Sequence, residues 1–134
     1  GYAMADHMHT SLVCQAIDMA VRRCPIKKGV TIFHSGRGSQ YTSQRFLDHL
    51  KSYGIPTSVG RTGVCWDNAW AESFNATLKN ERVHRMVYPT KDKAMNDIAS
   101  WIELRYNRTR LHSALGYRTP DEVESDFLDL TKVA

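Results

Sequence analysis

Helical and strand-like patterns alternate along the first half of this chain, and this alternation limits the possible folds more than any other feature. Apolar residues recur at helical spacing over 12–21. The run Val-Thr-Ile-Phe at 30–33 is rich in β-forming residues and predicts a buried strand. Helical spacing returns over 43–53, and 55–59 is the next strand candidate. Strands that alternate with helices are typical of an α/β domain.

The second half of the chain is expected to be helical. Asp67 suits the N-cap of a helix that runs to about residue 83, and a further apolar stripe predicts a helix over 90–106. Pro120, with acidic residues directly behind it, predicts a short last helix. At the other end of the chain, Gly1 to Ala5 is short and apolar and is expected to be the end of a strand.

Composition argues against several classes of protein. The 134 residues match one domain, and a hydrophobic fraction of 42% can form a core. No apolar run approaches the roughly 18 residues that a membrane span needs, and no cleavable signal pattern is present. We therefore expect a cytoplasmic chain with no membrane partner. The three cysteines are widely spaced and form no CxxC motif, which favours reduced structural thiols over zinc ligands.

The charge of the chain permits a nucleic-acid partner without requiring one. The formal net charge is +4 and the sequence pI is about 9.1. The cations are clustered, with Lys79, Arg82 and Arg85 in one segment and several arginines over 105–118 in another. Contacts to a DNA backbone and a solvated or structural role explain the second cluster equally well.

The helix expected from residue 67 has two different faces. At about 100° per residue, Trp70, Phe74 and Leu78 fall on an apolar side, whereas Glu72 and Lys79 lie two turns apart on the polar side. A carboxylate that holds a divalent cation and a lysine that holds a phosphate would suit DNA chemistry. The alternative is the solvated outer face of an ordinary amphipathic helix, and the helix alone favours that alternative.

Four side chains near this helix have both a structural and a functional interpretation. His34 is able to approach a metal ion, but a hydrogen-bonded histidine at a strand end is the commoner case. Asp67 is better explained as an N-cap than as a metal ligand. Trp66 and Trp70 are candidates for stacking on nucleobases. Trp70 is expected in the core because it falls on the apolar face, while both interpretations stay open for Trp66.

Three blocks of sequence together resemble one family. HSGRGSQYTS at 34–43, WDNAWAESFNATLKNE at 66–81 and YNRTRLHSALGYRTP at 106–120 are similar, in order and spacing, to the C-terminal part of the integrase core of DDE insertion-sequence transposases. These proteins belong to the retroviral-integrase-like superfamily. The resemblance implies an RNase H-like fold that lacks its opening strands and carries a helical C-terminal extension. On this basis 1–87 is expected to be the α/β part of a partial integrase core and 88–134 its helical part.

The resemblance also implies a chemistry. The family uses Mg²⁺ or Mn²⁺, held by three acidic residues, to cleave DNA at element ends and to transfer the 3′-hydroxyl into target DNA. Two metal ions suit this reaction because one activates the attacking oxygen and the other stabilises the leaving oxygen. Glu72 matches the third acid and would be a metal ligand, whereas Gly36 stands where the second acid is expected. The first acid belongs to an opening strand upstream of Gly1.

Expected DNA contacts follow from the same resemblance and from the charge clusters. Lys79 matches a position suited to a DNA phosphate, and Arg37 matches the surroundings of the second acid. Arg110 lies in the tail motif, for which positioning and DNA contact are both open. Arg82 and Arg108 complete the expected DNA-binding set.

One carboxylate of an expected three predicts a chain that is inactive alone, because Mg²⁺ binds through few, well-placed oxygens. Missing central strands predict unpaired sheet edges and therefore a homo-oligomer, with DNA of the element ends and the target as the other partner. Two rival interpretations remain. In the first, the enzyme is active and another chain or upstream residues supply the missing acids. In the second, the chain is a non-enzymatic DNA-binding or assembly module. The expected location is the bacterial cytoplasm, at the nucleoid.

Overall fold

The computed structural model describes residues 1–63 and 65–132. The chain divides into two compact units, Gly1–Ser73 and Phe74–Ala134, and the boundary falls inside helix α4 (Ala69–Glu81). The division of the domain into an α/β part over 1–87 and a helical part over 88–134 stays a prediction. None of the described helices is both long enough and apolar enough to cross a bilayer.

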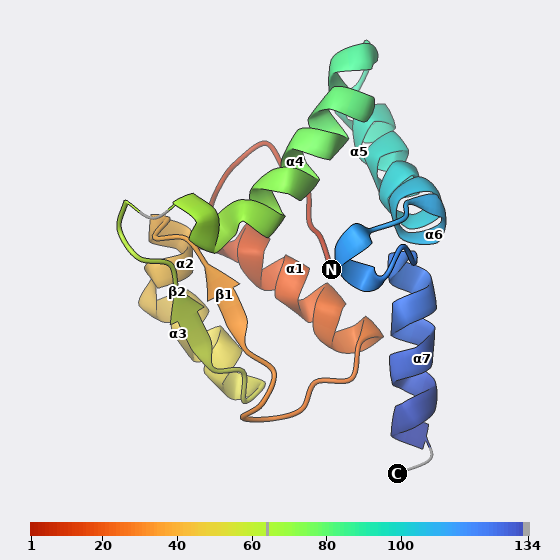
Figure 1. Ribbon diagram of the computed structural model, residues 1–134. Helices are drawn as coiled ribbons and strands as arrows, with labels where there is room; N and C mark the ends of the chain where they lie inside the picture. The colour runs from red at the N-terminus through yellow and green to blue at the C-terminus, as the bar shows by residue number, and fades with distance from the viewer. Residues whose placement is uncertain (64, 133–134) are drawn as a thin grey trace. The chain divides into compact units, whose positions relative to one another are not determined.

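The Gly1–Ser73 unit contains the only strands assigned among the described residues. β1 (Phe33–Ser35) and β2 (Thr57–Val59) pair in parallel, with Phe33 opposite Thr57 and Ser35 opposite Val59 (Figure 1). The predicted alternation of helix and strand in this half is confirmed. The other elements of the unit are α1 (Thr10–Arg23), α2 (Ser39–Thr42), α3 (Gln44–Ser52), the 3₁₀ turn η1 (Cys65–Asn68) and the start of α4.

The core of this unit is formed mainly by α1 and α3. Phe46 and Leu50 on α3 are fully buried and pack with Cys14 and Ile17 of α1. The burial of Cys14 confirms a structural role for this thiol. Ser43 begins α3 as its N-cap, because its side-chain oxygen accepts a hydrogen bond from the backbone N–H of Phe46 at 3.4 Å.

The strand expected over 30–33 begins only at its last residue, Phe33. The preceding residues form a turn, in which the N–H groups of Val30 and Thr31 both donate to the carbonyl of Lys27. Val30 is 69% exposed as a result. The expectation of a buried strand is therefore wrong for the start of this run, because local turn hydrogen bonds outweigh its β propensity.

Residues 1–5 form no strand, so the strand end expected there is wrong. The backbone N–H of Tyr2 is directed at the Sδ atom of Met19 on α1, 3.4 Å away. The opening segment therefore lies along α1 instead of pairing with a strand.

The Phe74–Ala134 unit is helical among its described residues, as the sequence predicts. The expected helix over 90–106 ends in a π-helical turn. The last helix begins at Pro120 as predicted, but it has 13 residues, so the expectation of a short helix is wrong. After α4, the elements are η2 (Val83–Arg85), α5 (Lys91–Ser100), the π-helix η3 (Trp101–Tyr106), α6 (Asn107–Thr109), η4 (Ser113–Leu115) and α7 (Pro120–Lys132).

Local capping sets where α7 begins. The hydroxyl of Thr119 accepts a hydrogen bond from the N–H of Glu122, and the Glu122 carboxylate accepts one from the N–H of Thr119 at 2.8 Å. This reciprocal pair is a capping box, and it satisfies two backbone donors that the start of a helix leaves free. Among the residues of this unit whose burial is described, Trp101 and Ile102 are the buried apolar ones, and both belong to η3.

Candidate functional site

Two glycines mark the place where the strands end. Gly36 follows β1 and Gly60 follows β2, and because the strands are parallel, both lie at one edge of the sheet. The Gly60 N–H donates to the carbonyl of Ser35 at 2.9 Å. The side chain of Asn68, the last residue of η1, approaches both glycines. Its Nδ2 atom lies 3.5 Å from an ideal Cβ on Gly36 and 3.2 Å from one on Gly60. The residues that lead into α4 are thus held against the strand ends.

The backbone at Gly36 does not require a glycine. Its φ angle lies outside the left-handed region that favours glycine, and a Cβ there would meet only ordinary van der Waals contacts with Asn68. A side chain as small as aspartate therefore has room to start from this position. The local fold therefore does not enforce the absence of the acid that the family resemblance predicts at this position.

Glu72 lies in the first turn of α4, one turn beyond Asn68 along the chain. It is exposed, and its carboxylate has no hydrogen bond or ion pair with any residue that the structure describes. Such a free carboxylate suits the ligand role expected for it. Within residues 1–63 and 65–132, however, no three His, Cys, Asp or Glu side chains come together to hold a metal ion. The carboxylates present therefore do not fit the pair of divalent cations that the family resemblance implies.

Asp67 closes a loop instead of capping the helix, so its predicted N-cap role is wrong. It lies inside η1, and its carboxylate accepts hydrogen bonds from the backbone N–H and the Nε of Arg61, at 3.0 and 3.3 Å. The backbone hydrogen bond, followed by the guanidinium, holds the pKa of Asp67 below its usual range. The loop after β2 is thereby tied to the residues that precede α4.

The aromatic residues of this region are more exposed than expected. Trp70 is 73% exposed, so its predicted place in the core is wrong. The reason is that the core of this unit is formed by α1, α3 and neighbouring segments, and no residue of α4 is buried. Trp66 is 69% exposed, which leaves it available for contact with another molecule. His34 shows the structural role that was favoured for it, because its Nδ1 hydrogen-bonds to Ser58 Oγ across the strand pair at 2.9 Å.

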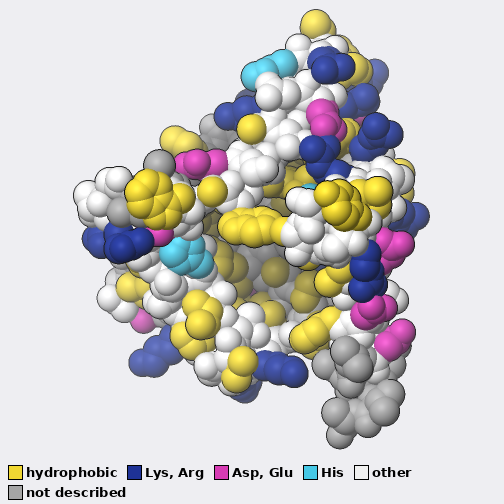
Figure 2. All heavy atoms as spheres, viewed as in Figure 1, with side chains coloured by type: hydrophobic (Ala, Val, Ile, Leu, Met, Phe, Trp, Pro, Cys, Tyr) yellow, Lys and Arg dark blue, Asp and Glu magenta, His cyan; other side chains and the backbone are white. Residues whose placement is uncertain are grey.

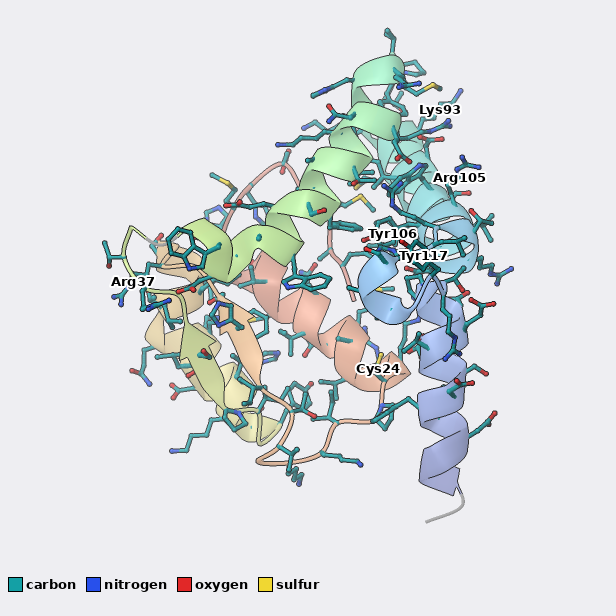
Figure 3. The ribbon with its side chains drawn as sticks, in the orientation of Figure 1. Cys24, Arg37, Lys93, Arg105, Tyr106 and Tyr117 are labelled. Carbon is teal, nitrogen blue, oxygen red and sulfur yellow. The ribbon has the colours of Figure 1, made fainter. Side chains whose placement is uncertain are left out.

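A cavity of about 400 Å³ lies beside the strand ends. Arg37 forms part of its wall and is fixed there, since its Nε donates to the Gly60 carbonyl at 3.1 Å (Figure 3). A basic wall at the ends of parallel strands suits an anionic ligand. The other lining residues are Gly36, Gly60, Arg61, Thr62, Gly63 and Asn68.

The DNA-contacting cations predicted in the other unit differ in how they are held. Lys79 on α4 is exposed and has no hydrogen bond or ion pair with a described residue. The three arginines are each paired with a carboxylate, which reduces the charge that they offer to a phosphate. The pairs are Arg82 with Asp97, Arg108 with Asp121, and Arg110 with Glu81.

The Arg82–Asp97 pair is the most tightly organised of these. Arg82 donates to the Asp97 carboxylate through both Nε and Nη2, and the Tyr88 hydroxyl donates to the same carboxylate at 2.6 Å. These hydrogen bonds, the one from Arg82 foremost, lower the pKa of Asp97 from 3.8 to about 2. Asp97 in turn raises the pKa of Arg82. Together they fix α5 to the end of α4.

We expect Asp97→Asn to lower the free energy of unfolding by about 1–2 kcal/mol at neutral pH, because it removes a charge-assisted hydrogen-bonded pair that is still partly exposed. Because the folded-state pKa of Asp97 is depressed, its contribution is present above pH 3.8 and is lost as the pH falls through about 2. Urea unfolding at several pH values measures this effect.

In Asp97→Asn, the free energy of unfolding should therefore depend less on pH between 3.8 and about 2 than in wild type. Asp92→Asn, at an exposed aspartate in the first turn of α5, is the matched control and should keep that dependence. If the free energy of unfolding depended on pH in the same way for wild type and Asp97→Asn, the stabilising role assigned to the Asp97 carboxylate would be contradicted.

Sequence patterns missed several of the residues that shape these sites. Asp97 and Tyr88 fix Arg82, and Arg61 fixes Asp67, yet none of the three carries a motif. The only hint in the sequence was that Asp97 falls within a segment whose apolar periodicity predicts a helix. That periodicity gives the buried face of a helix but not the neighbour that its polar residues meet.

Comparison with protein families accounts for nearly the whole chain. Two models, both described as integrase core domain, match residues 1–65 and 53–120. Among curated proteins, the IS600 uncharacterized 31 kDa protein of Shigella sonnei is 41% identical over 119 residues, which is 89% of this chain and 43% of that protein. The IS904 transposase of Lactococcus lactis is 36% identical over 124 residues, 92% of this chain and 49% of the relative. The transposase InsF of IS3A from Escherichia coli is 34% identical over 128 residues, 96% of this chain and 44% of the relative.

The chain thus spans less than half the length of these relatives. A solved structure shows the same fold: the catalytic core domain of BIV integrase superposes with a TM-score of 0.64 at 18% identity, covering 97% of this chain and 79% of that one. This likeness confirms the predicted RNase H-like, integrase-core class of fold. The blocks around Gly36 and Glu72, the two family models and the transposase relatives all agree. The chain therefore belongs to the integrase core domain family, in the branch found in insertion-sequence transposases.

Proposed function

We propose that this chain takes part in DNA transposition as the Glu72-bearing portion of an insertion-sequence transposase, and that by itself it binds DNA without transferring strands. Family membership supports the first half of this proposal. Integrase core proteins act in DNA transposition or integration and generally depend on divalent metal ions, so DNA is the partner that the family favours.

The position of Gly36 supports the second part of the proposal, that the chain alone transfers no strands. This residue lies at the end of β1 beside Asn68, where an acid is expected, and it has no side chain. Glu72 is the one carboxylate that matches the family pattern in this chain. A hard cation such as Mg²⁺ requires several well-placed oxygen ligands, so a single carboxylate gives weak binding.

Binding to DNA is supported by the unpaired and basic side chains. Lys79 and Glu72 are both exposed and free of partners among the described residues, and Arg37 lines the cavity at the strand ends. Self-association is supported by the short sheet, because each of the two described strands has an edge without a partner strand, and such edges pair readily with another chain.

The test uses the purified chain and DNA that carries the terminal repeats flanking its own gene. With Mg²⁺ or Mn²⁺ present, we expect no cleaved ends and no joined product. We expect DNA binding that persists in EDTA and weakens steeply as salt rises, because phosphate contacts release counterions. Light scattering is expected to show species larger than one chain.

Each readout can overturn its own part of the proposal. Metal-dependent cleavage by the purified chain that Glu72→Gln abolishes would contradict the expected inactivity and favour the rival interpretation, in which the enzyme is active. The absence of DNA binding at low salt would contradict the DNA-binding role. A clean monomer at high concentration would contradict self-association.

A further inference from the structure

A second cavity, of about 540 Å³, lies wholly within the Phe74–Ala134 unit. Its wall combines four arginines with two aromatic residues, and it is distinct from the strand ends where Gly36 lies. A volume of this size falls in the range of small-ligand sites. Figure 2 shows Lys and Arg side chains gathered in the region of α5 and α6. The six lining residues that matter here are Arg82, Arg85, Arg105, Arg110, Trp101 and Tyr106.

The charges in this cavity do not cancel. Two of its arginines are neutralised, Arg82 by Asp97 and Arg110 by Glu81. Among the described residues, Arg85 donates only to a backbone carbonyl, that of Asn80, at 2.8 Å. The Arg105 guanidinium has no hydrogen bond or ion pair with any described residue. Two uncompensated guanidinium groups therefore line the cavity, which makes it attractive to an anion.

The π-helix η3 explains why Arg105 and Tyr106 line the same cavity. In a π-helix, the backbone bonds from residue i to residue i+5, and the N–H of Asn107 bonds to the carbonyl of Ile102 in this way. Tyr106 consequently lies beside Trp101, with ring centroids 5.6 Å apart, and Arg105 adjoins it (Figure 3). π-helical turns are frequent at functional sites.

The surroundings of Tyr106 favour a phosphate over a nucleobase. Its ring is contacted by Phe74 at 4.9 Å and by His112 at 5.1 Å, and the Arg110 guanidinium lies 5.9 Å from its centroid. These neighbours leave little ring surface for a stacked base. The hydroxyl has no hydrogen-bond partner among the described residues, and burial raises the pKa of Tyr106, so this group stays protonated as a donor.

From this geometry we infer that the cavity is a phosphate-binding site, in which Arg105 and Arg85 supply the free cations and the Tyr106 hydroxyl supplies a hydrogen bond. Arginine suits this role because its planar fork of donors matches phosphate oxygens. The phosphate comes either from a DNA strand or from a small free phosphate. The first source rests on the proposed function, whereas the site itself does not.

The test measures binding of three probes to the full chain by calorimetry: inorganic phosphate, a 5′-phosphorylated single-stranded oligonucleotide, and the same oligonucleotide with a 5′-hydroxyl. We expect inorganic phosphate to bind and to compete with the phosphorylated oligonucleotide. Arg105→Gln should weaken phosphate binding about tenfold, the effect of losing one charge-assisted hydrogen bond. Tyr106→Phe keeps the ring packing and should weaken binding roughly fivefold, as expected for a neutral hydrogen bond.

Lys93→Gln is the control, because it removes one positive charge from an exposed position of the same unit outside the cavity (Figure 3). It should leave phosphate affinity within about twofold, since a solvated charge outside the cavity is screened. Much tighter binding of the phosphorylated oligonucleotide than of inorganic phosphate would identify DNA as the source. Binding of inorganic phosphate without binding of the phosphorylated oligonucleotide would identify a small ligand.

The inference is overturned if no probe binds, or if Arg105→Gln and Lys93→Gln change phosphate affinity equally. These outcomes are separable from failure of the proposed function. Salt-dependent binding of terminal-repeat duplex DNA, together with an Arg105→Gln effect on phosphate affinity no larger than that of Lys93→Gln, would keep the DNA-binding role while removing this site. Circular dichroism of each variant establishes that its fold is intact.

Discussion

Replacing Gly36 by aspartate should strengthen Mn²⁺ binding by this chain at least tenfold. The family resemblance places an acid at this position, and the structure has room for its Cβ beside Asn68 at 3.5 Å. Glu72 is exposed and without a partner among the described residues, so it is free to act as the other ligand. Loss of groups that only support a metal ligand costs about 10–100-fold in affinity, so gain of a ligand should have at least an effect of this size. Calorimetry with Mn²⁺ measures the change.

Two variants separate metal ligation from simple charge. Gly36→Asn has nearly the same shape as the aspartate variant without its charge, and it should not strengthen Mn²⁺ binding. Adding Glu72→Gln to Gly36→Asp should reverse the gain. An affinity that is the same for Gly36→Asp and wild type would show that the two positions do not form a common site.

Replacing Phe46 by alanine should lower the free energy of unfolding of the Gly1–Ser73 unit by about 3–5 kcal/mol, the usual cost of truncating a buried phenylalanine. Phe46 of α3 is completely buried and packs with Cys14 and Ile17 of α1. Its ring meets Phe33 of β1 edge-on at 5.2 Å and Tyr41 of α2 at 6.0 Å. The substitution therefore removes the group that joins the helices to the strand pair that carries Gly36. Urea unfolding followed by circular dichroism measures the loss.

Val30→Ala in the same unit is the matched control. Val30 is 69% exposed, so its truncation should change the free energy of unfolding by less than about 0.5 kcal/mol. A cost below about 1 kcal/mol for Phe46→Ala would mean that the site collapses around the smaller side chain and that this cluster is not the core of the unit.

The sequence predicted those elements whose causes are local. α1 and α3 have helical periodicity, and Ser43 caps α3 as a serine at that position should. The start of the last helix at Pro120 was predicted for the same reason, and Thr119 completes its cap. Propensity and capping act within a few residues, so they are readable without tertiary structure.

The wrong predictions have causes outside the segment from which each was made. Trp70 follows the apolar periodicity of its helix and is nevertheless exposed, because no residue of α4 joins the core cluster of its unit. Asp67 has the chemistry of an N-cap, but Arg61 in the preceding loop takes its carboxylate. The strand expected over 30–33 loses its first residues to a turn on Lys27. In each case a partner that the pattern does not specify decides the outcome.

The sequence by itself determined the family of this protein and the order of most of its helices and strands, and it predicts that Gly36 and Glu72 stand at the positions of two family acids. Only the tertiary structure decided that Asn68 lies against Gly36, and that Arg82 and Arg110 are neutralised by carboxylates while Arg105 has no partner in the part of the chain that the structure describes. The physical reason is the separation along the chain over which each kind of interaction acts. Hydrophobic periodicity and helix capping act between neighbours in the chain, whereas ion pairs and cavities join residues that only folding brings together.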